Sequence, residues 1–238
     1  MVTKLVLGDI AIDVVLKDIK NVHLSVHPPM GHVRISAPSR MKIDTVRLYA
    51  ISKLDWIKSQ QKQLRSQQRE PRRDYLERES HYVWGKRYLL RISEHDAPPA
   101  VEFSNRAFVL RIRPETSFEK RQRIIEAWYR EQAKAAAESL FRKWEPVIGV
   151  KVEGLFIQRM KTRWGSCNTQ ARTIRLNPEL VKKTPECLEY IVVHEMIHLI
   201  ERNHNERFRS YMEHFLPAWS AIREELNRAP LAHTDWSY

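Results

Sequence analysis

Cysteine and glycine are scarce in this sequence of 238 residues, which contains two cysteines and six glycines. Two cysteines are too few for a disulfide framework, and Cys167 and Cys187 lack the C-x-x-C spacing of a zinc ribbon. No apolar run approaches the roughly 18 residues of a membrane-spanning helix, and Asp9 and Asp13 interrupt the start before a signal-like apolar segment develops. These absences predict a cytoplasmic protein in a reducing compartment, with no membrane partner.

The sequence does have enough apolar residues for a core, and it has an excess of positive charge. Hydrophobic residues make up 42% of the chain, which suits one large domain or two small ones. The formal net charge of +12 favours polyanions, because cationic side chains release counterions from phosphate groups. The densest basic stretch covers residues 58–79. A solvated basic helix and linker is the commoner origin of such a stretch, so nucleic acid is only a candidate partner.

The first half of the chain is patterned like strands. Alternating apolar and polar residues over 10–38 predict strands, with a hairpin turn at the Pro-Pro-Met-Gly sequence. Apolar spacing from 41 to about 68 predicts one amphipathic helix, which Pro71 ends. Alternation returns over 82–113 and predicts more antiparallel sheet. We therefore expect residues 1–115 to form an antiparallel, β-rich N-terminal part with one helix.

A different organisation begins near Thr116. Strong helix formers over residues 117–144 predict one long helix, and alternation over 150–176 predicts a small sheet. Thr184, followed by a proline suited to the first helical turn, predicts the start of an apolar helix. The chain is therefore expected to be α+β, with residues 116–238 forming a compact core.

The stretch VVHEMIHLIERNHNERF, residues 192–208, contains three histidines and a glutamate. On a helix that turns about 100° per residue, His194 and His198 lie about 40° apart, so both imidazoles can reach one metal ion. Glu195 can present a carboxylate to a water on that ion, as H-E-x-x-H does in metal-dependent hydrolases. Apolar residues cover nearly the whole circumference, so the helix is expected to be buried. A helix whose histidines serve packing alone is the alternative, but it leaves the cost of burying these polar groups without compensation.

A catalytic zinc ion needs a third protein ligand and keeps its fourth position for water. Three candidates lie downstream of the motif, namely His204, Glu213 and His214. A thermolysin-like glutamate would stand at Ala218, and Glu201 stands where metzincins have the glycine of their turn.

His204 qualifies as a ligand only if the helix ends before it. On a continuing helix it would point about 240° away from His198. Asn203 tolerates the left-handed conformation that ends helices, and Asn205 can cap the next helix. The spacing therefore permits His204 on condition of a break near Asn203.

The sequence around this motif resembles a known family, the YgjP-like metallopeptidases, which are related to SprT-like and WLM-type zinc proteases. The resemblance is specific over residues 161–219 and looser upstream. Residues 164–167 match a W-G-S-C block and residues 176–177 match an L-N pair. His204 and Phe208 match an H-x3-F pattern after H-E-x-x-H.

The resemblance implies a gluzincin-like catalytic core that binds one Zn²⁺ per chain. It implies His194, His198 and His204 as the zinc ligands and Glu195 as the catalytic carboxylate. The expected function is thus zinc-dependent hydrolysis of peptide bonds in a peptide or protein substrate, with Glu195 as general base. We expect the substrate to add as an extended strand beside residues 161–176, where an exposed sheet edge would recognise its backbone.

Four residues near the motif receive weaker expectations. Trp164 and Cys167 are expected to pack rather than react, because no base can be assigned to activate the thiol. Tyr211 and His214 are candidates for stabilising an oxyanion, although each is expected more often to pack or to face water.

Two functions from other classes remain open. One is a non-catalytic scaffold that holds zinc for folding. The other is a DNA-associated protease or nucleic-acid-binding protein whose basic N-terminal part docks on DNA. The residues whose neutralisation tests DNA docking are Lys62, Arg65, Arg69, Arg72 and Arg73.

Overall fold

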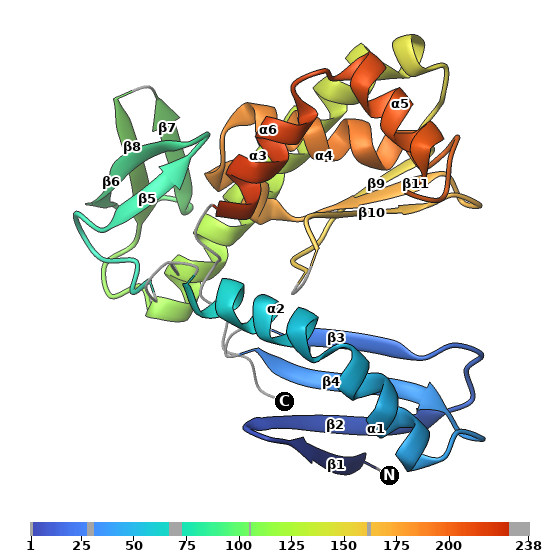
Figure 1. Ribbon diagram of the computed structural model, residues 1–238. Helices are drawn as coiled ribbons and strands as arrows, with labels where there is room; N and C mark the ends of the chain where they lie inside the picture. Colours follow the sequence, from blue (N-terminus) through green and yellow to red (C-terminus); the bar gives the residue numbers. More distant parts are fainter. Residues whose placement is uncertain (1, 28–30, 67–72, 105, 161–162, 229–238) are drawn as a thin grey trace. The chain divides into compact units, whose positions relative to one another are not determined.

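The computed structural model describes residues 2–27, 31–66, 73–104, 106–160 and 163–228 (Figure 1). The chain divides into two compact units, with the boundary between Glu70 and Pro71. This boundary differs from the one expected before Thr116, because the strands of residues 80–112 share a core with the long helix that follows them. Within the described residues, no helix is both long enough and apolar enough to cross a membrane.

The first unit contains a four-stranded sheet in the order β1-β2-β4-β3. Its strands are β1 (Val2–Leu7), β2 (Ile10–Lys17), β3 (His23–His27) and β4 (His32–Pro38). The antiparallel pairing of β3 with β4 confirms the predicted hairpin, and residues 28–30 of the predicted turn lie outside the described residues. The expectation of a purely antiparallel sheet is wrong, because β2 and β4 pair in parallel. The chain crosses from β2 to the far edge at β3, and the hairpin then returns it beside β2.

Two helices follow this sheet, where one was expected. They are α1 (Ile43–Ser52) and α2 (Leu54–Ser66), separated at Lys53. Val46, Ala50 and Ile57 are fully buried against the inner face of the sheet. Leu48 and Ile51, expected on the apolar face, are 68% and 47% exposed. Because the helix is interrupted at Lys53, the apolar faces of α1 and α2 do not join into one continuous apolar stripe.

The second unit begins with another four-stranded sheet, in the order β5-β6-β8-β7. Its strands are β5 (Ser80–Val83), β6 (Lys86–Glu94), β7 (Ala100–Ser104) and β8 (Ala107–Ile112). Here too one pair, β6 and β8, is parallel. The predicted long helix is α3 (Phe118–Ile148), which ends at Gly149 in the left-handed conformation. Phe108 of β8 packs with Ile125 and Tyr129 of α3.

The remaining elements form the helical part of the same unit. They are β9 (Gly154–Ile157), β10 (Gly165–Asn168), β11 (Thr173–Leu176), the 3₁₀ helix η1 (Pro178–Lys182), α4 (Pro185–Ile197), α5 (Glu206–Phe215) and α6 (Trp219–Arg228). The three strands have the order β10-β11-β9, and the predicted hairpin is the antiparallel pair β10–β11. Helix α4 contacts this sheet as well as α3, α5 and α6, so it is the centre of the core (Figure 1).

Candidate active site

Helix α4 begins and is buried as its sequence predicts. Thr184 is its N-cap residue in extended conformation, and Pro185 occupies the first turn. The Thr184 side chain makes no capping hydrogen bond and instead donates to Glu225 Oε1 of α6 at 3.0 Å. Val192, Val193, Met196 and Ile197 are fully buried. The motif histidines therefore stand on a helix that is fixed from several sides.

The three predicted histidines lie together. The ring centroids of His194, His198 and His204 are 4.7 to 4.9 Å apart in each pair. One ligand atom from each ring can be chosen so that all three lie within 4.8 Å of one another. His194 Nε2 and His204 Nε2 are 3.0 Å apart. Glu213 and His214, the other third-ligand candidates, are exposed on α5 and are not part of this group.

His204 reaches the motif because the helix ends early. After Ile197 the chain continues through a turn at residues 198–200, with Glu201 N donating to Ile197 O. Asn205 then caps α5 by accepting from Phe208 N at 3.0 Å, as predicted. The role expected of Asn203 is wrong, because it is not among the described residues with positive φ. The turn directly after the second histidine provides the break instead.

Phe208 packs against all three histidines. Its ring centroid lies 4.9, 4.8 and 4.7 Å from those of His194, His198 and His204. It is 3% exposed, so it closes the inner side of the cluster. His198 is also oriented by Glu201, whose carbonyl accepts from His198 Nδ1 at 3.1 Å. A donating Nδ1 leaves the Nε2 lone pair available to a ligand.

The electrostatics of the cluster favour the neutral form of His194 and of His204. Burial, and then the nearby rings of His198 and His204, lower the pKa of His194 to about 3. Burial and His198 also lower the pKa of His204. Neutral imidazole is the form that ligates metals, and three histidines with one open position are typical of zinc. The donor set therefore fits a zinc ion held by His194, His198 and His204.

Glu195 is the most deeply buried acid of the site, at 6% exposure. Burial raises the pKa of its carboxyl to about 8, against the opposing effect of the Arg163 guanidinium. The carboxylate lies against Gly165 of β10, where a Cβ would come within 2.7 Å of Glu195 Oε1. A carboxyl with this environment exchanges a proton near neutral pH.

The W-G-S-C block supports the site from the sheet. Trp164 is half-buried against the core, with the Lys183 ammonium 5.9 Å from its ring centroid. Cys167 is also half-buried, and burial followed by the charge of Glu195 raises the pKa of its thiol to about 11. A thiol with this pKa is protonated and is a poor nucleophile. The packing roles predicted for both residues agree with these environments.

The L-N pair fixes the loop before β10. Asn177 is buried, and its Nδ2 donates to Met160 O at 2.9 Å and to Arg163 O at 3.1 Å. Its backbone N donates to Trp164 O at 2.8 Å, and its Oδ1 caps η1 by accepting from Glu179 N. One asparagine thus holds both ends of this loop.

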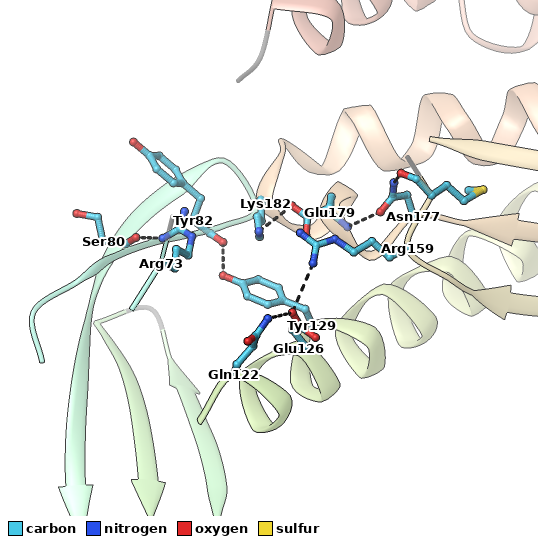
Figure 2. A network of polar contacts seen from close by, with 11 residues as sticks. Arg73, Ser80, Tyr82, Gln122, Glu126, Tyr129, Arg159, Asn177, Glu179 and Lys182 are labelled. Atoms are coloured by element: carbon cyan, nitrogen blue, oxygen red, sulfur yellow. Dashed lines mark hydrogen bonds and ion pairs between the residues drawn. The ribbon is translucent and has the colours of Figure 1, made fainter. Parts of the chain in front are cut away.

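A network of polar contacts connects this loop with the second sheet (Figure 2). The Arg159 guanidinium forms ion pairs with two glutamates: Nη1 lies 3.5 Å from Glu126 Oε1 of α3, and Nη2 lies 3.9 Å from Glu179 Oε1 of η1. Tyr129 OH, one turn along α3, donates to Tyr82 O of β5 at 2.8 Å. The sheet of β5–β8 is therefore joined to the elements that carry the site, as Figure 2 shows.

Three residues near the histidines were not anticipated from the sequence. The ring of Tyr190 makes an edge contact with the ring of His194, with 5.8 Å between centroids. It also stacks on the ring of Trp219 of α6, with 6.5 Å between centroids. The Arg223 guanidinium lies 6.0 Å from the Trp219 ring centroid and contributes to lowering the pKa of His194. Trp219 and Arg223 are four residues apart on one helix, so their spacing predicts that they are neighbours. It does not predict that they lie near the histidines of the motif.

The two candidates for oxyanion stabilisation have other partners. Tyr211 OH accepts from Arg207 at 3.2 to 3.3 Å, and its ring stacks on Phe215. His214 makes an edge contact with the same phenylalanine at 4.9 Å. Neither belongs to the group of three histidines.

Comparisons with known proteins identify the family of the chain. Two solved structures are similar to part of the chain. The first is the metallopeptidase zymogen abylysin of Pyrococcus abyssi, which is 22% identical in sequence and has a TM-score of 0.36. The match covers 40% of this chain and 99% of abylysin. The second is the metallopeptidase zymogen jannalysin of Methanocaldococcus jannaschii, with 23% identity and a TM-score of 0.33 over 40% of this chain and 92% of that one. A comparison with curated proteins gave no significant match. The model of the YgjP-like metallopeptidase domain matches residues 20–229, which is most of the chain. The chain therefore belongs to the YgjP-like metallopeptidase family and is a peptidase.

Proposed function

We propose that this peptidase is zinc-dependent and that Glu195 is its general base. The observation that carries the proposal is the group of three histidines, whose ligand atoms lie within 4.8 Å of one another beside a buried glutamate. Three neutral imidazoles are typical of zinc among the metals available to proteins. Membership of a peptidase family argues against a non-catalytic scaffold.

The proposed chemistry assigns one task to each group. When bound, zinc would polarise the scissile carbonyl, lower the pKa of a water toward about 7 and favour the ionised form of Glu195. Glu195 takes a proton from the attacking water and returns it to the leaving amine. Its burial keeps the carboxyl poised near neutral pH, because a fully solvated glutamate would be too weak a base.

We propose that the substrate binds as an extended strand along β10. Within the described residues, β10 pairs only with β11, so its other edge presents unpaired backbone groups. Such an edge recognises a peptide through its main chain, with little dependence on side chains. The strand begins at Gly165, beside Glu195, so a peptide here would pass close to the proposed base. Residues 161–162 of the predicted segment lie outside the described residues.

The test of the general base is Glu195→Gln. This change keeps the shape of the side chain and removes the base, so hydrolysis of unfolded casein should fall by roughly 10² or more while bound zinc stays constant. Glu186→Gln is the matched control, because Glu186 is exposed at the start of the same helix. Equal rates for wild type and Glu195→Gln would refute the mechanism.

The ligand set has its own test. Zinc content measured by mass spectrometry should fall well below one per chain in His204→Ala and should stay unchanged in Glu213→Ala. The opposite result would show that the third ligand is misassigned. An anomalous-scattering map at the zinc edge would identify both the metal and its ligands.

A second function is favoured by a basic groove on the sheet of β5–β8. We propose that this groove binds the phosphate backbone of nucleic acid. The residues lining it include Arg78, Arg87, Arg91, Arg106 and a single acid, Glu77. Guanidinium groups match phosphate oxygens in charge and geometry. Of the five basic residues named for DNA docking, Arg69 and Arg72 lie outside the described residues.

The groove is tested by pairs of substitutions with the same loss of charge. Arg87→Gln with Arg91→Gln should weaken DNA binding and reduce the salt slope by about one for each lost phosphate contact. Arg130→Gln with Arg142→Gln, on the exposed face of α3, should change binding less. Equal effects of both pairs, or no DNA binding by wild type at low salt, would end this proposal.

We propose a cytoplasmic location, supported by the two cysteines, which are both free thiols. Fractionation of cells that express the full chain tests this proposal. Recovery of the protein with disulfide-linked partners from an oxidising compartment would contradict it.

A further inference from the structure

Gly165, the first residue of β10, lies where a side chain cannot be added without displacing a neighbouring atom. A Cβ built on it would lie 2.7 Å from Glu195 Oε1, 2.8 Å from Glu195 Cγ and 2.8 Å from Ile191 Cγ2. Optimal separations between non-bonded carbons are about 3.5 to 4.0 Å. Even the smallest side chain at this position would therefore displace the glutamate, the isoleucine or the strand.

The backbone does not explain the glycine. The described glycines with positive φ are Gly8, Gly31, Gly85 and Gly149, and Gly165 is not among them. Alanine could adopt the Gly165 backbone without strain, since only positive φ penalises a Cβ. The requirement for glycine comes from the close approach of β10 to α4.

Two residues on the inner face of β10 lie close to Glu195. Side chains alternate along a strand, so residues 165 and 167 share the face toward α4. Cys167 is half-buried in the core cluster that contains α4, and the charge of Glu195 contributes to the raised pKa of its thiol. The Glu195 carboxylate is thus held against the strand whose free edge we assign to the substrate.

We propose that Gly165 is a positioning residue that acts through Glu195. Its lack of a side chain lets the carboxylate lie in the gap between α4 and β10, and so sets the distance from the base to a peptide on the strand edge. This inference rests on the proposed role of Glu195. It assigns the glycine of the W-G-S-C block a task in catalysis rather than in backbone conformation.

Gly154 of β9 provides a matched control in the same sheet. A Cβ there would meet Thr173 Cγ2 at 3.1 Å, and its next nearest atom is 3.7 Å away. Gly154 also lacks a positive φ, so substitution by alanine tests the methyl group alone. It faces no residue of the proposed catalytic machinery.

The experiment compares Gly165→Ala with Gly154→Ala in the full chain. Displacing a catalytic group by about 1 Å can cost roughly 10²-fold, so kcat of Gly165→Ala should fall on that order. Its KM and its zinc content should stay at the wild-type values, as should all three quantities in Gly154→Ala. Unchanged kcat in a folded, zinc-loaded Gly165→Ala protein would overturn the inference.

A thermodynamic cycle in metal-free protein separates positioning from simple crowding. Glu195→Ala removes two of the three atoms that a new methyl would meet, so Gly165→Ala should lower Tm in that background by about half as much as in wild type, or less. The same loss of Tm in both backgrounds would show that Glu195 does not occupy the gap, and would overturn the inference. If Gly165→Ala alone does not fold, restored folding in the Glu195→Ala background supports the inference, and failure to restore it counts against it.

The Glu195→Gln variant keeps this inference distinguishable from the proposed function. Full activity in Glu195→Gln would remove the general base, and the role of Gly165 with it. Loss of activity in Glu195→Gln together with full activity in Gly165→Ala would leave the proposed function intact and refute the positioning role alone.

Discussion

The two four-stranded sheets of this chain have the same strand order and pairing but different neighbours. In each, two hairpins are joined so that the second strand runs parallel to the fourth. The first sheet shares its core with α1 and α2 in one compact unit. The second shares its core with α3, which also packs against α4. The same topology thus forms a separate unit in one case and part of the catalytic unit in the other.

The second sheet also contacts the segment that leads into the motif helix. Trp84 N, in the turn between β5 and β6, donates to Val181 O of η1 at 2.6 Å. Gly85, in the same turn, has a φ of +76°, and a Cβ there would lie 2.9 Å from Thr184 Cγ2. Because Thr184 is the N-cap of α4, this sheet helps to fix where the motif helix starts. Strand order alone therefore does not tell which sheet supports the site.

The largest expected effect on stability comes from replacing a large buried residue of each sheet by alanine. Phe108→Ala in β8 should cost about 3 to 5 kcal/mol and should lower both zinc content and peptidase activity, because α3 loses its packing partner. Ile35→Ala in β4 should cost about 2 to 5 kcal/mol, yet hydrolysis of a short peptide should stay within about twofold of wild type. Thermal unfolding and peptide hydrolysis measure both quantities. Equal loss of hydrolysis in both variants would break the comparison.

The parts of the site that are local in sequence were predictable. The 3.6-residue period places His194 and His198 on one face of α4, and an apolar circumference indicates its burial. The asparagine at position 205 is a typical N-cap, and it does cap α5. Helix ends are less certain, because the break after the second histidine has neither glycine nor proline to mark it.

Contacts between distant segments were not predictable. Alternation has the same period in parallel and antiparallel strands, so it could not reveal that β2 pairs in parallel with β4. The break between α1 and α2 at Lys53 likewise has no glycine or proline signal. The contact of Gly165 with Glu195 joins residues thirty positions apart, and a single sequence contains no measure of that distance. Tertiary packing decides all three.

The next effect concerns His81, a buried histidine of the second sheet. Within the described residues neither ring nitrogen has a hydrogen-bond partner, and Glu79 Oε2 is too distant at 3.8 Å. Burial, followed by the charges of Arg73 and Lys182, lowers the pKa of His81 to about 3. These effects outweigh the attraction of Glu79, so the ring is neutral in the folded protein.

This lowered pKa makes stability depend on pH. The unfolded chain binds a proton at His81 below its ordinary pKa of about 6.5, while the folded protein does not until about pH 3. The contribution to stability is therefore complete above pH 6.5 and is lost as pH falls, by about 2 to 3 kcal/mol between pH 6.5 and 4.5. Urea unfolding at several pH values should show a weaker dependence in His81→Phe. An unchanged dependence would mean that His81 is not the titrating group.

A smaller effect is expected from the hydrogen bond between α3 and β5. Tyr129→Phe removes the donor to Tyr82 O, and the loss should cost about 1 kcal/mol. Ser25→Ala is the counterpart in the first sheet, where a half-buried hydroxyl donates to Arg34 O at 3.2 Å and lies 2.9 Å from His27 Nε2. Water reaches this partly exposed side chain and replaces its bonds in part, so their loss should cost less than the loss of the Tyr129 bond. Similar costs in urea unfolding would show that the second sheet is no more tightly joined than the first.

The smallest expected effect on activity is that of Cys167, although it faces the same gap as the proposed base. Its thiol is half-buried and protonated, since burial and the charge of Glu195 raise its pKa to about 11. A hydroxyl at this position keeps nearly the same volume and removes no group that the proposed mechanism uses. Cys167→Ser should therefore retain kcat within about twofold, whereas Glu195→Gln should lose roughly 10² or more. Complete loss of peptide hydrolysis in a folded, zinc-loaded Cys167→Ser protein would mean that the thiol takes part in the chemistry, and that the inner face of β10 does more than make room for Glu195.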